Sequence, residues 1–256
     1  MGCMQRNLLL LLVVALFGSL FSFCSAEEIS PQEIVKRSDD LLRGDTQKGN
    51  YTMTITTPGW ERTLKLYVDS KGRDKMFIRI LSPAKEKGIT TLRIKNEMWN
   101  YLPNVERIIK IPPSMMLQPW MGSDFANDDL VKESSVVHDY THRLIREEKR
   151  EGADVYCIEL TPRPQAGVVW DKRIMWIRKA DFIPVRDEYY GKNNKLIKVL
   201  VYTHIKKISD RRIPSRWEMI AETQKNHRTV IEVGDDVVYN GDIADSVFSL
   251  QNLKSK

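Results

Sequence analysis

The stretch EMWNYLPNVERIIKIPPSMMLQPWMGSDFANDDL, residues 97–130, decides the fold. It begins as two short strands, EMWNYL and VERIIKI, joined at Pro103 and Asn104. Proline presets φ there and asparagine tolerates a left-handed conformation, so this dipeptide predicts a turn. Pro112 and Pro113 then end the strand pairing, because neither has a backbone N–H to donate. We therefore expect a β-sheet followed by a segment that covers it.

That covering segment is rich in apolar side chains, although Pro119 and Gly122 interrupt it. Its large apolar residues are Met115, Met116, Leu117, Trp120 and Met121. By residue type alone they favour a cap on one end of a β core, since methionine fills irregular gaps well. The alternative is the lid of an adaptable apolar pocket, since methionine-rich surfaces repack around varied partners.

The chain before this stretch predicts one helix and a series of strands. Ser30 is a suitable N-cap, with Pro31 at the first helical position and Glu33 at the third. We expect an amphipathic helix of about 13 residues that ends at Gly44 and lies on a sheet. Strand-like segments follow at residues 51–57, 62–69, 74–81 and 90–95.

Alternation along these segments predicts strands with one buried face. In residues 62–69, Leu64 and Leu66 share a face with Val68, and polar residues occupy the other face. The second half of the chain continues the pattern, with strand-like segments at residues 142–150, 153–163, 170–179, 183–191, 194–208, 213–223 and 227–235. Neighbours joined by short turns are typical of an antiparallel meander with one buried face. A single sheet of this length has to curl, close or be covered.

Two shorter helical pieces are also predicted. Residues 123–130 begin with capping side chains, and Phe125 and Leu130 could point inward. Residues 242–248 form a turn or short helix that we expect Phe248 and Leu250 to anchor.

Residues 1–26 predict a secretory signal peptide, and we expect cleavage before Glu27. Arg6 supplies the basic start, residues 8–23 the apolar run, and residues 24–26 the small side chains of a peptidase site. The apolar run is shorter than the ~20 residues of a membrane-spanning helix. A lipidated Cys24 is the alternative, although the bulky residue before it departs from a lipoprotein signal. The expected product is a single domain, residues 27–256, in the periplasm.

The charge and cysteine content narrow the classes of function. The formal net charge is +6 at pH 7. Without Arg6 the formal net charge is 6 − 1 = +5. This positive charge is spread over the chain and suits contact with an anionic membrane surface. The sequence has no cluster of basic residues interleaved with aromatic ones, as nucleic-acid binding would need. Cys157 is the one cysteine beyond the signal peptide, so no intrachain disulfide can form.

The sequence carries no motif that demands catalysis or a cofactor. It has no glycine-rich phosphate loop, no G-x-S-x-G and no paired cysteine ligands. His138 and His142 are four residues apart, but on a strand that places them roughly 13 Å apart. No third ligand accompanies them, so we predict no metal site and no catalytic residue.

Two motifs of the quoted stretch point to a family. WNYLP (residues 99–103) with Arg107 and Lys110, and MGSDF (residues 121–125) with the following DDL, stand in the same order as in a group of exported carriers. The chain resembles the outer-membrane lipoprotein-sorting branch of the LolA-like periplasmic lipoprotein carrier superfamily. The resemblance covers essentially all of residues 27–256 and includes the terminal Phe248-x-Leu250.

The resemblance implies a mainly β (α+β) fold. One antiparallel sheet of about eleven strands would curl into an unclosed barrel, with helices covering its open mouth. It also implies no enzyme activity and an apolar cavity for acyl chains. In the carrier, an arginine followed four residues later by phenylalanine lines the cavity and governs the lid; Arg73 and Phe77 are similarly placed, although the surrounding residues differ. The candidate lipid-binding residues, in the cavity or in its lid, are Leu64, Leu66, Arg73, Phe77, Trp99, Tyr101, Met115, Met116, Leu117, Trp120 and Met121.

The expected function is that of a monomeric periplasmic carrier of lipid or lipoprotein acyl chains. It would work with an inner-membrane transporter and an outer-membrane acceptor, and bind no nucleic acid. The alternative is an envelope sensing module that holds a membrane protein partner, as related stress regulators do. A third hypothesis is an enzyme on the same scaffold that acts on lipid, with His138 and His142 as its candidate site.

Overall fold

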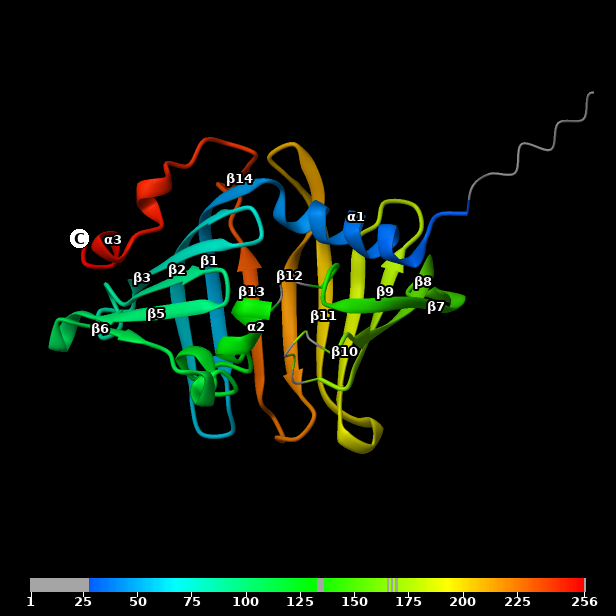
Figure 1. Ribbon diagram of the computed structural model, residues 1–256, viewed down its shortest axis with the longest axis horizontal. Helices are drawn as coiled ribbons and strands as arrows, with labels where there is room; N and C mark the ends of the chain where they lie inside the picture. Colours follow the sequence, from blue (N-terminus) through cyan, green and yellow to red (C-terminus); the bar gives the residue numbers. More distant parts are fainter. Residues whose placement is uncertain (1–27, 133–135, 165, 167, 169, 256) are drawn as a thin grey trace, which may run out of the picture. The chain divides into compact units, whose positions relative to one another are not determined.

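The computed structural model describes residues 28–132, 136–164, 166, 168 and 170–255. The predicted signal peptide and its cleavage site lie outside the described residues. Residues 31–256 form one compact unit, dominated by a single antiparallel sheet (Figure 1).

The strands of this sheet vary from two to 14 residues in length. They are β1 (Thr46–Thr56), β2 (Glu61–Lys71), β3 (Lys75–Ser82), β4 (Thr90–Ile94), β5 (Glu97–Leu102), β6 (Arg107–Lys110), β7 (Tyr140–Arg150), β8 (Ala153–Pro162), β9 (Lys172–Arg178), β10 (Pro184–Gly191), β11 (Lys195–Ile208), β12 (Arg211–Ala221), β13 (Arg228–Val233) and β14 (Val238–Tyr239). These 14 strands, counted within the described residues, exceed the predicted number. Every segment predicted as a strand contains one, and the two-residue β14 is additional.

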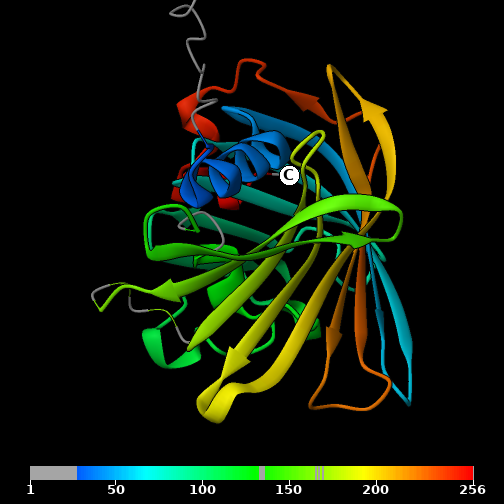
Figure 2. The ribbon, with the colours of Figure 1, turned by 90° about the vertical axis from the view of Figure 1, so that its right-hand side faces the viewer.

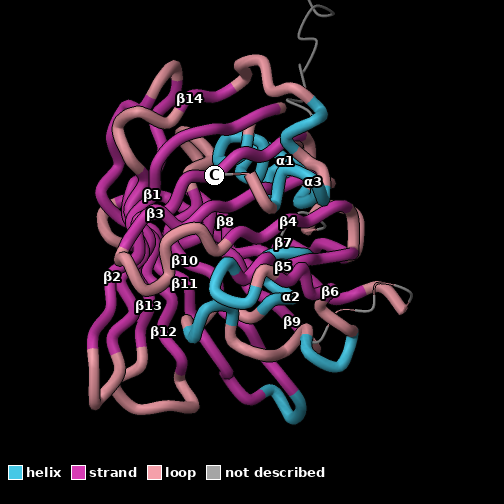
Figure 3. Tube along the Cα trace, turned by 90° about the vertical axis from the view of Figure 1, so that its left-hand side faces the viewer, coloured by secondary structure: helices cyan, strands magenta, loops and turns pink. Residues whose placement is uncertain are grey.

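The order of the strands leaves the sheet open. Hydrogen bonds connect them as β6-β5-β4-β3-β2-β1-β13-β12-β11-β10-β9-β8-β7, with β14 beside β1. In the described part of the chain β6 and β7 therefore end the sheet, which curves without closing (Figures 2 and 3). The predicted mainly β fold, with one unclosed antiparallel sheet and few helices, is confirmed.

Alternation sets which side chains enter the core on the concave face. In the pairing of β1 with β2, Met53 lies opposite Leu64 and Tyr51 lies opposite Leu66. All four side chains are buried in one cluster. Fully burying an aliphatic side chain of this size stabilises the fold by about 1.5–3 kcal/mol, so one-sided strands of this kind hold the sheet in its curved form.

The helix α1 (Pro31–Arg43) lies across the concave face and contacts β7, β9 and β12 (Figure 2). Ile34 and Val35 are buried beneath it, as expected for the apolar face of an amphipathic helix. Gly44 ends the helix at φ +63°, a left-handed conformation that favours glycine, and its N–H bonds the Asp40 carbonyl at 2.9 Å. The predicted helix is confirmed at both ends.

The covering segment, residues 112–132, lies over the concave face as short turns rather than a long helix (Figure 1). It contains the 3-10 turns η2 (Pro113–Met115) and η3 (Trp120–Gly122) and the helix α2 (Asn127–Lys132). Trp120 is buried, and its indole N–H donates to the Thr91 hydroxyl at 3.2 Å. Phe125 is buried and Leu130 half-buried, which confirms that both point inward.

The C-terminal segment packs on the opposite, convex face. The turn η6 (Asp245–Val247) and the helix α3 (Leu250–Leu253) follow β14. Phe248 and Leu253 join a buried cluster with Phe77 and Leu92. Leu250, predicted as an anchor, is 46% exposed; Leu253, one helical turn further on, takes that place.

Candidate functional site

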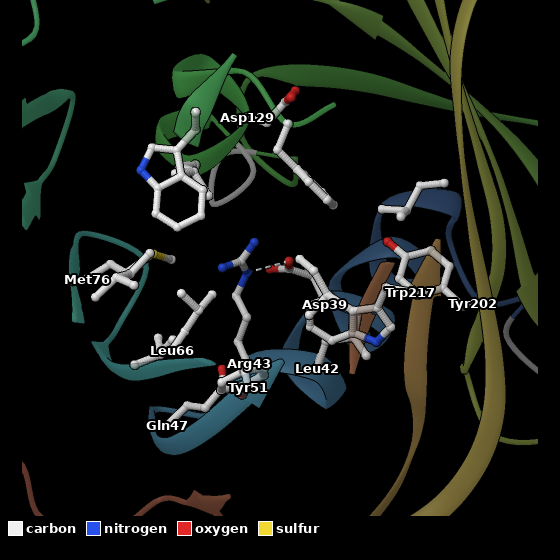
Figure 4. A pocket seen from close by; sticks show the side chains of 17 residues that line it. Asp39, Leu42, Arg43, Gln47, Tyr51, Leu66, Met76, Asp129, Tyr202 and Trp217 are labelled. Atoms are coloured by element: carbon white, nitrogen blue, oxygen red, sulfur yellow. Dashed lines mark hydrogen bonds and ion pairs between the residues drawn. The ribbon is translucent and has the colours of Figure 1, made fainter. Parts of the chain in front are cut away.

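A cavity of about 170 Å³ lies between the concave face of the sheet and the elements that cover it (Figure 4). A single water molecule needs only ~10–15 Å³ on this scale, so the space is a genuine hollow. Its lining residues are Asp39, Leu42, Arg43, Gln47, Tyr51, Leu66, Val68, Met76, Ile78, Trp120, Phe125, Asp129, Leu130, Leu200, Tyr202, Trp217 and Ile231.

One wall comes from β2 and β3. Leu66 and Val68 alternate inward on β2, and Val68 lies opposite Ile78 on β3. Met76, two residues before Ile78, shares its face. This wall is wholly apolar and contains a flexible methionine that can adapt its shape.

The facing wall comes from β11, β12 and β13. Tyr202 lies opposite Trp217, and Trp217 lies opposite Ile231, so the side chains of three neighbouring strands meet in one row. The rings of Tyr202 and Trp217 meet edge to face, with centroids 6.1 Å apart and planes at 65°. This edge-to-face geometry is a favourable one for aromatic pairs, and it holds a flat apolar surface against the cavity.

The roof consists of α1 and the covering segment. Leu42 of α1 and Trp120, Phe125 and Leu130 of the covering segment reach the cavity. Trp120 forms part of the roof, and the hydrogen bond from its indole N–H to Thr91 fixes the ring there. The hollow therefore lies under segments that are not strands of the sheet.

A cluster of charged side chains stands at the α1 end of the cavity. The Arg43 Nε donates to Asp39 at 2.8 Å, and Arg73 forms ion pairs with both Asp39 and Asp40, the second at 2.5 Å. Arg93 is fully buried behind them and donates to the Arg73 carbonyl at 2.6 Å. Burial, with the nearby charge of Arg43, lowers the pKa of Arg93 to about 10, so the group stays charged at neutral pH.

A second charged pair joins the covering segment to the sheet. Asp129 on α2 forms an ion pair with Lys198 on β11, and their side chains are only 5% and 6% exposed. The Lys198 ammonium lies 4.6 Å from the ring centroid of Trp170 and 4.9 Å from that of Tyr189. Asp129 also accepts the Ala126 N–H at 2.7 Å, which ties the pair to the start of α2.

The predicted site residues divide between the two faces of the sheet. Leu66 and Trp120 line the cavity, and Leu64 is fully buried in the core beside them. Phe77 and Trp99 lie instead on the convex face under the C-terminal segment. Tyr101 lies there too, because residues two apart on β5 share a face. The structure corrects the prediction that these three aromatic side chains line the cavity.

The other predicted residues surround the cavity without lining it. Arg73 holds α1 through its two ion pairs, at the edge of the site. Met116 and Met121 are half-buried against the core. Met115 and Leu117 are 45% and 57% exposed, which places them on the outer side of the covering segment, away from the cavity wall.

Sequence reasoning missed the wall made by Leu200, Tyr202 and Trp217. Their strands are predicted, and alternation along residues 194–208 places Leu200 and Tyr202 on one face. The signal was therefore present, but it did not say which face of these strands meets the covering segment.

Three further observations concern metal ligands, a histidine and membrane spans. Among the described residues, no group of three or more His, Cys, Asp or Glu side chains is placed to hold a metal ion. His142 is half-buried, with a ring nitrogen 3.0 Å from the Val136 carbonyl, and burial lowers its pKa. No helix in the described part of the chain has the length and apolar character needed to cross a membrane.

The sequence was compared with protein families and with curated proteins. A family model that bears the description "Uncharacterized protein" matches residues 72–255. A search of curated proteins finds no significant match.

Three crystal structures are similar to the chain over most of its length. A DUF1329 family protein from Desulfovibrio piger aligns with a TM-score of 0.80 and 24% identity, over 87% of this chain and 97% of that chain. A LolA superfamily protein from Nitrosomonas europaea gives 0.74 and 24%, over 88% and 99%. An outer membrane lipoprotein-sorting protein domain from Vibrio parahaemolyticus gives 0.77 and 22%, over 88% and 98%. These likenesses confirm the predicted LolA-like fold.

Proposed function

The chain belongs to the family whose model, described as "Uncharacterized protein", matches residues 72–255, and from its LolA-like fold and its cavity we propose that it is a carrier of acyl chains. The cargo is a lipid or the lipid part of a lipoprotein. The observation that carries this proposal is the empty apolar hollow under the covering segment.

The lining of the cavity suits an acyl chain in its chemistry. Most of its side chains are aliphatic or aromatic, and they come from both halves of the sheet. Moving one methylene from water into such surroundings is favourable by about 0.8 kcal/mol, so several buried methylenes give useful affinity without any specific polar contact.

The roof suits a cargo that has to be released. The covering segment is held to the sheet by contacts that include the Trp120–Thr91 hydrogen bond and the Asp129–Lys198 ion pair. Half-exposed Met115 and half-buried Met116 belong to the same segment, and methionine repacks readily around different contents. A roof of short turns opens more easily than a strand of the sheet would, because fewer backbone hydrogen bonds have to break.

The proposed place of action is the periplasm, after removal of the N-terminal signal peptide. There the carrier takes its cargo from an inner-membrane transporter and gives it to an acceptor at the outer membrane. The description of the Vibrio parahaemolyticus neighbour as an outer membrane lipoprotein-sorting protein supports this direction. The protein performs no covalent chemistry on its cargo.

The test is direct detection of bound lipid. The protein is purified without detergent, extracted with organic solvent and analysed by mass spectrometry, and then titrated with a fluorescent fatty acid. We expect both co-purified lipid and saturable uptake. A protein that carries no lipid and takes up no fatty acid would end the proposal.

A pair of variants assigns the uptake to the cavity. Val68→Phe adds bulk at the wall between Leu66 and Met76, whereas Val105→Phe adds the same bulk at an exposed position. Displacing about two methylenes of cargo is worth ~1.6 kcal/mol, so Val68→Phe should weaken uptake roughly tenfold. Val105→Phe should bind as the natural protein does, and equal effects of the two variants would place the lipid elsewhere.

A further inference from the structure

The cavity is apolar along most of its length but charged at its α1 end. Among the described residues that line it, Arg43 is the one basic side chain. It stands in the last turn of α1, and Figure 4 shows its guanidinium pointing into the cavity from beside Tyr51 and Leu66. A cation at this place contacts whatever fills the hollow.

Several basic side chains gather around Arg43. Asp39 is shared between Arg43 and Arg73, and Asp40 is shared between Arg73 and Lys36. Arg93 adds a buried cation close enough for Arg43 to lower its pKa, and Asp74 acts on it in the opposite direction. Three arginines, Arg43, Arg73 and Arg93, therefore stand at this corner and are better shielded from water than Lys36 and Asp40, whose side chains are 51% and 45% exposed. Charge interactions are stronger where water is partly excluded.

Two carboxylates also line the cavity: Asp39, which pairs with Arg43 and Arg73 at the α1 end, and Asp129 at the α2 end. Asp129 lines the cavity, whereas its partner Lys198 is buried between Asp129 and the rings of Trp170 and Tyr189. The α2 end therefore presents a carboxylate to the contents of the cavity, which disfavours an anion there. The two ends differ in sign, so an amphiphile has one preferred orientation.

We propose that Arg43, supported by Arg93, binds the anionic head group of the cargo at the α1 end, while the acyl chain extends toward Tyr202 and Trp217. This inference rests on the proposed function and adds the class of cargo, an acyl chain that bears a carboxylate or a phosphate. A guanidinium suits both groups, because its planar N–H donors match their oxygen atoms in pairs.

The test compares amphiphiles that share one tail. Calorimetric titration of the full protein, after delipidation, uses dodecanoate, dodecyl phosphate and 1-dodecanol. We expect the two anions to bind at least tenfold more tightly than the alcohol, since a hydrogen bond to a charged group contributes more than a neutral one. The relative affinities of dodecanoate and dodecyl phosphate distinguish a fatty-acid cargo from a phosphate-bearing one.

Variants locate the head group. In Arg43→Gln the anion-to-alcohol ratio should fall to within about twofold of one, and in Arg43→Lys it should be partly retained, because the charge remains. The matched control is Arg143→Gln, since Arg143 is exposed on β7 and pairs with Glu159 at 2.7 Å. It removes the same charge and should leave the ratio of the natural protein unchanged.

The outcomes separate this inference from the proposed function. If no amphiphile binds the natural protein, the proposed function fails and this inference fails with it. If the alcohol binds as tightly as the anions, the carrier stands and the head-group site is wrong. A ratio that survives Arg43→Gln but is lost in Lys198→Gln would place the head group at the α2 end and overturn the assignment.

Discussion

Replacing Lys198 by methionine should destabilise the protein far more than the loss of a surface charge would. The substitution keeps most of the side-chain volume and leaves the Asp129 carboxylate buried without its ammonium partner. Removing one member of a buried pair costs about 3–5 kcal/mol, because a buried charge then lacks compensation. We take the lower figure, since Asp129 keeps the hydrogen bond from the Ala126 N–H.

The assay is urea unfolding of four proteins, namely the natural chain, Lys198→Met, Asp129→Leu and the double variant. Each single variant should lose roughly 3 kcal/mol, which corresponds to a fall in Tm of about 6–12 °C for a domain of this size. The double variant should lose about 3 kcal/mol, no more than either single variant, because removing the second member of the pair takes away the uncompensated charge.

The coupling between the two sites decides the outcome. Residues in direct contact show interaction free energies of about 0.5–3 kcal/mol, and a buried pair belongs at the upper end of that range. If the two single effects simply add, or if each lies within about 0.5 kcal/mol of zero, the pair does not fasten the covering segment to β11.

Other consequences can be measured in the same protein. Arg73→Met removes two ion pairs to α1 and should raise amide hydrogen exchange in that helix about tenfold, whereas Arg143→Met should not. Leu253→Ala should cost about 2–5 kcal/mol of unfolding free energy, and the exposed Leu250→Ala less than about 0.5 kcal/mol. Burial raises the pKa of the Cys157 thiol from 9.0 to about 11, so it should resist a thiol reagent at pH 8 until the protein unfolds. Because the folded state holds this proton more tightly, its contribution to stability is full below pH 9 and is lost as the pH rises toward 11.

The order of strands and helices could be predicted from local patterns because those patterns are short-range. A two-residue period fixes which side chains of β2 share a face, and Pro31 and Gly44 mark the ends of α1 by their own backbone preferences. These signals need no knowledge of distant parts of the chain. Both elements were therefore found from the sequence.

The cavity wall could not be predicted in the same way, because both faces of β3 carry large apolar side chains. Met76 and Ile78 face the hollow, whereas Phe77 is covered by Phe248 and Leu253 from the other end of the chain. Only that distant contact decides which face is closed and which stays open. The same ambiguity applies to β5, where Trp99 is predicted at the cavity or its lid but packs against the cluster on the convex face.

The pairing of β1 with β13 has a consequence for how the protein folds. Tyr51 on β1 lies opposite Val233 on β13. The two halves of the sheet can therefore join only when β13, near the C-terminus, pairs with β1. Contacts of such sequence separation slow folding, since a long loop must close before they form. Until then each half is a separate sheet with one exposed apolar face and no enclosed cavity. We expect a nascent or truncated chain to lack the cavity that would bind an acyl chain. Loading with lipid should therefore follow synthesis and folding of the whole polypeptide.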